Sequence, residues 1–528
     1  MAGKKTVQKT AEKKFALISA FDKDGIVDLA PTLHDLGYAV ISTGGTAKIL
    51  EKNNIPVVPI QEITGNPESF DGRMKTISFQ IESGILFDRT NEEHVREANI
   101  LKIRPIDIVV CNLYPFEQTI QKPNVTLNEA IECIDVGGPT MVRAAAKNFK
   151  NVLVVTDPSD YERVGEALET NQATEILRKD LAAKAFAHLS FYDSQIAAYL
   201  RENSFPEEIT LPGKKVLDLR YGENPHQKGS LYVSPQEKSP FASLQKLWGR
   251  DLSLTNVTDI NSGLESVRVF TEPAAVIIKH NSPCGIALGK SGAEALLRAI
   301  EADPESAFGG VIVINRSLDM RAAKIIANFK NEKHGNIDII AVPGVYLKVL
   351  DFLKQVRKSM GIYVFGAISE ITKTRVDLKW VDGGFILQTR DDFIEKGFLD
   401  WKIVTKKKPT RKQLAQMQIA WKFVTRIRSN SVIVVDKKLP MTRGIGSGQT
   451  SRLRSTKIAL SQAGKFAKKA ILASDSFFPF DDSVKLASQH GIAAIVQQGG
   501  SINDQASIDA ADKAGIAMAF TNRRAFWH

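Results

Sequence analysis

The sequence predicts an α/β protein built from several domains, and three observations lead to this. The 528 residues are 43% hydrophobic and 24% charged, which is typical of globular chains and excludes disordered or collagen-like ones. Short apolar runs rich in Val and Ile alternate with amphipathic stretches, the pattern of strands alternating with helices. At about 150 residues per domain, the length indicates roughly three domains.

The elements of the first half can be read from these runs. Apolar runs predict buried strands at 15–20, 38–42, 108–113 and 152–155. Between the first two, apolar residues recur at helical spacing at Ile26, Leu29, Leu33 and Leu36. Pro31 lies inside this pattern and argues against one continuous helix.

In the second half we expect strands at 275–278, 311–314, 337–341, 431–435, 492–496 and 516–520. A turn-rich stretch at 203–214 with two prolines marks the main domain boundary. A second boundary lies near 370–410, where Lys406-Lys407-Lys408-Pro409 is typical of an exposed connector. The expected organisation is a basic disordered tail at 1–14, followed by domains at 15–202, 215–380 and 400–528.

Charge and cysteine content restrict the function further. Lys and Arg exceed Asp and Glu by 70 to 59, and the net charge of +11 favours anionic partners such as nucleic acid, acidic lipid or small polyanions. Three cysteines are too few for a disulfide framework, which indicates a reducing compartment. The lysine-rich start is not a secretory signal, and no apolar run approaches the roughly 18 residues of a membrane span. We expect a soluble, cytoplasmic protein.

A glycine-rich turn follows the second predicted strand. Thr43-Gly44-Gly45-Thr46 separates this strand from a helical pattern. The glycines let the backbone approach a ligand closely, and the free N–H groups at the start of the helix can bind an anion. The alternative is an ordinary turn with Thr46 as the helix N-cap. The turn is not a Walker loop, because no GK[ST] follows the glycines.

Other polar residues of the first half come near the ends of predicted strands, beside a glycine turn, or before or at the end of a predicted helix. They are Ser19, Lys23, the segment 71–76, Tyr114, Asp135 and Lys147. Each alone is more simply a solvated surface charge. Their convergence on the carboxyl ends of strands in a doubly wound sheet favours a ligand site.

Five motifs in this half resemble, in order, the IMP cyclohydrolase domain of the AICAR transformylase/IMP cyclohydrolase family. They are FALISAFDK from residue 15, STGGTAK, DGRMKT, CNLYPF and IDVGGPTMVRAAAKN. The resemblance implies a methylglyoxal-synthase-like parallel sheet. It also implies that the nucleotide is held by Ser19, Lys23, Thr43, Gly44, Gly45, Thr46, Arg73, Thr76, Cys111, Asn112, Val136 and Gly137. Lys147 would be the principal catalytic residue, with Lys75, Tyr114 and Asp135 around it.

The chemistry of ring closure suits these groups, because an ammonium stabilises oxyanion charge and a carboxylate orients or deprotonates an attacking amide. The chain departs from the family at three places. Ile77-Ser78-Phe79 and Glu82-Ser83-Gly84 stand where the family has Leu-His-Pro and His-Gly-Gly, and Phe21 stands where a serine is usual. These departures motivate an alternative, a transformylase whose cyclohydrolase domain is weakened.

In the second half, a KHNSPCG motif from Lys279 follows an apolar strand, a position that suits catalysis. A basic turn is the simpler interpretation. The signature of zinc deaminases, H-x-E with P-C-x-x-C, is incomplete: Ser282 stands in place of the Glu and Ala287 in place of the second Cys. The ligand count therefore argues against zinc.

Further motifs resemble the transformylase part of the same family: RYGENPHQ from Arg220, ESAFGGVIVIN, RSNSVIVV, GIGSGQTSR, ASDSFFPF and TNRRAFWH. This resemblance implies two cytidine-deaminase-like subdomains without zinc and a homodimer with active sites across its interface. It implies His280 as proton acceptor, assisted by Lys279 and Asn430. Implied substrate contacts are Arg220, Tyr221, Gly309, Asp338, Arg452, Phe477 and Arg524.

With both halves, the resemblance covers residues 15–528. It implies a bifunctional enzyme, a formyltransferase and a hydrolase of de novo purine biosynthesis, which formylates AICAR with 10-formyltetrahydrofolate and then closes the ring to IMP. The expected partners are small molecules and a second copy of the chain, without nucleic acid, membrane, metal or redox cofactor. An RNA-binding protein is a further alternative, but the sequence lacks the basic patches interleaved with aromatics that it needs.

Overall fold

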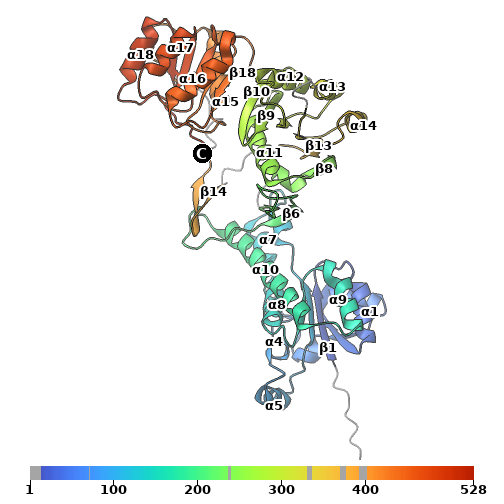
Figure 1. The fold of residues 1–528 in the computed structure, drawn as a ribbon. Coiled ribbons are helices and arrows are strands. Elements are labelled where there is room, and N and C mark those ends of the chain that lie inside the picture. The colour runs from blue at the N-terminus through green and yellow to red at the C-terminus, as the bar shows by residue number, and fades with distance from the viewer. Residues whose placement is uncertain (1–13, 71, 236–238, 330–335, 369–375, 392–400) are drawn as a thin grey trace, which may run out of the picture. The chain divides into compact units, whose positions relative to one another are not determined.

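The computed structural model describes residues 14–70, 72–235, 239–329, 336–368, 376–391 and 401–528. The chain divides into two compact units, Met1–Gly213 and Lys214–His528 (Figure 1). The expected tail lies outside the described residues except for Lys14, which begins the first strand. Of the expected second boundary, 370–375 and 392–400 also lie outside them.

The first unit is built on a sheet of five parallel strands in the order β3-β2-β1-β4-β5. Its strands are β1 (Lys14–Ala20), β2 (Tyr38–Ser42), β3 (Val57–Pro59), β4 (Ile108–Asn112) and β5 (Leu153–Val155). Its helices are α1 (Ile26–Asp35), α2 (Gly44–Lys52), α3 (Gln61–Thr64), α4 (Phe79–Leu86), α5 (Glu92–Ile100), α6 (Phe116–Ile120), α7 (Leu127–Glu132), α8 (Gly137–Lys147), α9 (Tyr161–Glu169) and α10 (Glu175–Leu200). The four predicted strands are confirmed to within one residue at each end, whereas the short, partly exposed β3 was not predicted.

Both faces of this sheet are buried. On β1, Phe15 and Leu17 contribute to a core with residues of α4, α8 and α10, while Ala16 and Ile18 contribute to a core with residues of α1 and α9. Alternate strand residues point to opposite faces, so a continuous apolar run is what a strand covered on both sides requires. The doubly wound parallel sheet predicted for this half is confirmed.

Helix α1 corrects one expectation. It runs without interruption from Ile26 to Asp35 with Pro31 inside it. Its buried residues, Ile26, Leu29, Ala30 and Leu33, lie on one face, and this packing against the sheet holds the helix together despite the missing N–H.

The second unit contains two six-stranded mixed sheets, in the orders β10-β9-β11-β12-β13-β8 and β16-β21-β20-β19-β17-β18, and two hairpins, β6-β7 and β14-β15. The strands are β6 (Lys214–Asp218), β7 (Ser230–Val233), β8 (Gln245–Trp248), β9 (Ala274–Lys279), β10 (Ser282–Leu288), β11 (Val311–Ile314), β12 (Ile339–Val342), β13 (Gly361–Val364), β14 (Val376–Val381), β15 (Gly384–Thr389), β16 (Lys402–Ile403), β17 (Val432–Val435), β18 (Thr442–Gly446), β19 (Ile471–Ser474), β20 (Ala494–Gln497) and β21 (Ala517–Phe520). The helices are α11 (Leu254–Val267), α12 (Gly292–Ala302), α13 (Met320–Asn328), α14 (Leu347–Val356), α15 (Arg411–Val424), α16 (Arg452–Ala463), α17 (Asp482–Gln489) and α18 (Asp504–Lys513). All six predicted strands of this half are present, with ends shifted by up to two residues.

The two large sheets meet edge to edge inside this unit. Ala287 of β10 bridges Met441, the Leu288 N–H donates to the Pro440 carbonyl over 2.8 Å, and a buried core runs from α11 to α15. None of the described helices combines the length and the apolarity of a membrane span. The three cysteines are free.

Candidate active sites

The carboxyl edge of the first unit's sheet brings together residues from three strands. Ser19 pairs in register with Cys111, and the neighbouring Ala20 pairs with Asn112. Strand β2, parallel to β1, ends at Ser42 and leads directly into Thr43. The edge therefore gathers the predicted residues that follow β1, β2 and β4, as a ligand site of an open parallel sheet requires.

Two of the predicted side chains hold the loop after β1. The Asn112 amide accepts from the Asp22 N–H and donates to the Asp22 carbonyl, both over 2.8 Å. The buried Thr46 hydroxyl accepts from the Ala20 N–H over 3.2 Å and donates to the Ala20 carbonyl over 2.9 Å. Asn112 and Thr46 thus fix the backbone that carries Lys23.

The alternative reading of Thr46 as an N-cap is wrong, because the N-cap of α2 is Thr43 and its side chain makes no capping bond. The first N–H groups of a helix have no intrahelical partner and point at whatever lies beyond the helix start. Gly44 has a φ of +56°, a conformation that favours glycine.

Two lysines approach the start of α2. A Cβ placed on Gly45 would lie 3.8 Å from Lys23 Nζ, and one placed on Gly44 would lie 3.7 Å from Lys75 Nζ. Lys23 also donates to the Phe21 carbonyl over 2.9 Å, and Lys75 pairs with Glu68 over 2.8 Å. A helix N-terminus flanked by two ammonium groups is an arrangement suited to a phosphate.

The segment after the Gly72 turn packs against the start of α8. A Cβ on Gly137 would lie 2.5 Å from the buried Thr76 hydroxyl, so these backbones touch only because Gly137 has no side chain. Arg73 is exposed and pairs with Glu132. Val136, the N-cap of α8, is exposed.

Asp135 precedes α8, and its carboxylate interacts with the start of that helix and with the backbone of Tyr114, which follows β4. Its Oδ1 accepts the Gly138 N–H over 2.9 Å, and its own N–H donates to the Tyr192 hydroxyl over 2.8 Å. Burial raises the pKa of Asp135, while backbone N–H bonds, including that of Tyr114, oppose the shift. Cys111 is buried, and its burial raises the pKa of the thiol.

Two aromatic side chains follow strands β1 and β4 at this edge of the sheet. Tyr114 and Phe21 are each about half exposed, and their ring centroids are 5.3 Å apart. The Phe21 ring also lies 5.8 Å from Lys23 Nζ. Phe21, which stands where the resemblance predicts a serine, thus places an aromatic ring beside Lys23 and Tyr114.

Lys147 is not brought to this edge within the unit. It is exposed and ends α8, ten residues after Gly137, which corresponds to about 15 Å along the helix axis. The resemblance gave it the principal role, so its position is the main difference between the implied site and the geometry of a single chain.

The segment in which the family histidines are absent forms the start of α4. Ser78 caps this helix by accepting the Ile81 N–H over 3.1 Å. The Oε1 atom of Glu82 is buried and has no hydrogen-bond partner among the residues that the structure describes, and burial raises the pKa of Glu82 to about 7. The sequence alone marked this position only as a departure.

In the second unit, His280 lies in a two-residue turn between β9 and β10. Lys279 pairs with Ser282, so His280 and Asn281 form the turn, with φ values of +54° and +60°. His280 is exposed, and Lys279 Nζ donates to the Phe308 carbonyl over 2.9 Å. Sequence reasoning missed Asp259 of α11, whose carboxylate accepts the Asn281 N–H over 2.7 Å.

Gly309 and Asp338 lie at the same edge of this sheet. Val311, the first residue of β11, pairs with Ile278 near the end of β9 and with Ile339 at the start of β12. Gly309 lies two residues before β11, and Asp338 immediately precedes β12. Gly309 has a φ of +70° and open space where a side chain would stand. Asp338 pairs with Arg250 over 3.0 Å.

Asn430 and Arg452 are in direct contact at the edge of the other large sheet. Arg452 is buried, pairs with Asp475 and donates from Nη2 to Asn430 Oδ1 over 2.7 Å. The Asn430 amide donates to the Gln449 carbonyl over 2.9 Å, and the peptide bond preceding Asn430 is cis.

The remaining predicted residues of this unit occupy loops. Phe477 is half-buried just after β19, and Arg524 is exposed just after β21, with its guanidinium 4.7 Å from the Phe526 ring. Strands β19, β20 and β21 are parallel, so these two loops leave the same sheet edge. Arg220 is exposed and donates to the Tyr221 hydroxyl over 2.8 Å.

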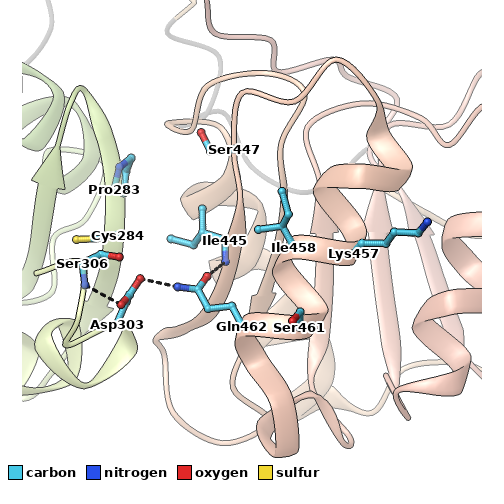
Figure 2. Close-up of a pocket in the computed structure, with 10 residues that line it drawn as sticks. All are labelled: Pro283, Cys284, Asp303, Ser306, Ile445, Ser447, Lys457, Ile458, Ser461 and Gln462. Carbon is cyan, nitrogen blue, oxygen red and sulfur yellow. Dashed lines mark hydrogen bonds between the residues drawn. The ribbon is translucent and has the colours of Figure 1, made fainter.

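A cleft of about 640 Å³ lies between the two large sheets of this unit (Figure 2). It is lined by Pro283, Cys284, Asp303, Ser306, Ile445, Ser447, Lys457, Ile458, Ser461 and Gln462. Gln462 spans it, donating to Asp303 over 2.6 Å and accepting the Ile445 N–H over 2.7 Å. No predicted site residue lines the cleft. Among the residues the structure describes, no three His, Cys, Asp or Glu side chains are grouped to share a metal ion.

Two family models match the chain. Residues 25–140 match the MGS-like domain family, and residues 145–462 match the family described as AICARFT/IMPCHase bienzyme. The chain is 45% identical to the bifunctional purine biosynthesis protein PurH of Thermoanaerobacter sp. over 98% of this chain and all of the relative. It is 44% identical, with the same coverage, to the PurH protein of Acetivibrio thermocellus. The crystal structure of ForH is 34% identical over 35% of this chain and 97% of its own, with a TM-score of 0.32.

Proposed function

The chain belongs to the AICARFT/IMPCHase bienzyme family, and from this premise we propose which residues carry out each half of its reaction. It is a bifunctional enzyme of purine biosynthesis, a formyltransferase acting on AICAR and an IMP cyclohydrolase. The observation that best supports separate sites is that the two groups of predicted residues occupy different compact units.

Formyl transfer is assigned to the second unit. The amine of AICAR attacks the formyl carbon carried by the folate nitrogen, a new C–N bond forms, and the amine proton goes to His280. The tetrahedral oxyanion then collapses, the bond from carbon to the folate nitrogen breaks, and that nitrogen takes up a proton. Lys279 and the Asn430 amide stabilise the oxyanion, and losing one such donor typically costs about 10²–10³ in rate.

Ring closure is assigned to the first unit. The phosphate of formyl-AICAR binds at the start of α2 between Lys23 and Lys75, whose ammonium groups approach Gly45 and Gly44. The carboxamide nitrogen attacks the formyl carbon, and the resulting carbinolamine loses water to give IMP. Asp135 orients the attacking amide, because its partly desolvated carboxylate lies between Tyr114 and the start of α8.

The other assignments follow from the same proposal. The remaining predicted contacts position the two nucleotides, and 10-formyltetrahydrofolate is the formyl donor. The enzyme is a cytoplasmic homodimer, its positive charge serves small anions in place of nucleic acid, and Lys147 acts on the nucleotide in the assembled dimer.

The test measures the two half-reactions separately. We expect His280→Ala to abolish formyl transfer from 10-formyltetrahydrofolate to AICAR while IMP formation from added formyl-AICAR continues at the wild-type rate. Loss of both activities would contradict separate sites. Wild-type enzyme that closes formyl-AICAR no faster than the uncatalysed reaction would instead support the transformylase with a weakened cyclohydrolase.

A further inference from the structure

The turn that carries His280 has a backbone conformation that its residues rarely adopt. A two-residue hairpin turn with positive φ at both central positions is typical of Asn-Gly or Gly-Gly. Here the positions hold His280 and Asn281, with φ values of +54° and +60°. Such a conformation at a non-glycine residue persists only where neighbouring groups hold it.

One buried carboxylate, that of Asp259, holds the backbone of this turn. Asp259 of α11 is 7% exposed, and its Oδ1 accepts the Asn281 N–H over 2.7 Å. The His280 backbone N–H also favours the charged form of this carboxylate and so lowers its pKa, against the rise that burial causes. One helical turn later, the Ser262 hydroxyl, 2% exposed, donates to the Asn281 side-chain oxygen over 3.2 Å.

We infer that Asp259 is a positioning residue for formyl transfer, which fixes the strained turn and so presents the His280 side chain to the substrate. This inference rests on the role proposed for His280. Asp259 holds the backbone of Asn281 and Ser262 holds its side chain, so helix α11 fixes the turn at two points. The imidazole then leaves the turn in one direction, and a reacting group misplaced by 1 Å costs up to about 10²-fold in rate.

The test measures both half-reactions of the full-length chain. In Asp259→Asn, the side chain keeps an oxygen acceptor but loses the charge that strengthens the hydrogen bond from the Asn281 N–H. We expect the kcat of formyl transfer to fall by about 10²-fold, with the KM for AICAR within about twofold of wild type because Asp259 does not touch substrate. Ring closure, on the other unit, stays at the wild-type rate.

A second substitution separates positioning from a general loss of structure. Glycine adopts positive φ without strain, so Asn281→Gly in the Asp259→Asn background should restore most of the lost kcat. Ser266→Ala is the matched control, because Ser266 is buried on the same helix and bonds only within it, to the Ser262 carbonyl. It should leave both activities unchanged.

Two outcomes would overturn the inference. One is a wild-type kcat in Asp259→Asn while His280→Ala loses formyl transfer, which leaves the proposed function standing. The other is a loss of kcat that Asn281→Gly does not restore. Retention of formyl transfer by His280→Ala would overturn the proposed function itself.

Discussion

Nη2 of Arg452 donates a hydrogen bond of 2.7 Å to Oδ1 of Asn430, and this contact determines which way the amide faces. The nitrogen of that amide then points to the Gln449 carbonyl, 2.9 Å away. An amide nitrogen carries two N–H donors, so one remains for a substrate oxygen. The buried arginine orients the group to which we assign oxyanion stabilisation.

Replacing Arg452 by Met should therefore reduce both stability and formyl transfer. The substitution leaves the fully buried Asp475 without its cation, which typically costs about 3–5 kcal/mol. Urea unfolding of the full chain should show an earlier transition for the second unit. The exposed Arg454→Met is the control, and an unchanged midpoint in Arg452→Met would refute the structural role.

Lys75→Met tests the anion site at the start of α2. A hydrogen bond to a charged group contributes about 1.5–3 kcal/mol, so we expect the KM for formyl-AICAR to rise by about 10- to 100-fold. Formyl transfer should not change. Steady-state ring closure followed by IMP absorbance measures this, and a wild-type KM would place the phosphate elsewhere.

Lys147→Ala tests the residue that lies at the far end of α8. If it acts on the nucleotide as proposed, ring closure is lost while formyl transfer continues. The exposed Lys150→Ala, just beyond the same helix, is the matched control and should have no effect. Undiminished ring closure in Lys147→Ala would restrict the site to the groups around Lys75 and Asp135.

Glu82 should make stability depend on pH. Its pKa is raised from 4.5 to about 7 by burial, so between these values the folded state binds more protons than the unfolded state. Stability is therefore lost as pH rises through this window, by about 1–2 kcal/mol once partial exposure is discounted. Glu82→Gln should unfold at a higher temperature than wild type at pH 8 and at nearly the same temperature at pH 4.5. Equal differences at both pH values would exclude the carboxyl as the cause.

Gly137→Ala should damage ring closure through packing alone. The added methyl group would lie 2.5 Å from the Thr76 hydroxyl, and one of the two segments must move. Overpacking displaces the backbone and typically costs about 1–3 kcal/mol. We therefore expect the KM for formyl-AICAR to be at least about tenfold higher. Gly384→Ala, at a position with open space around it, is the control. A wild-type KM would show that this contact does not shape the site.

Most of the strands and the identity of the fold could be predicted from the sequence. Runs such as 311–314 are apolar at every position. A strand that is buried on both faces requires such a continuous run, so these strands can be recognised from the sequence. Pro31 misled the prediction because local propensity was outweighed by the burial of the helix face around it. The short β3 was missed because it is only partly buried.

The candidate sites divide in the same way. The order of the motifs along the sequence predicted which site residues belong to each unit. The ends of the apolar runs predicted which of these residues follow a strand. Only the tertiary structure decided that Asn112 and Thr46 hold a loop, that Asp259 lies under His280, and that Lys147 is distant from Asp135 within one chain. These are relationships between segments 20 or more residues apart, or between the two ends of one helix. Local pattern cannot specify such distances, since they depend on how the elements pack.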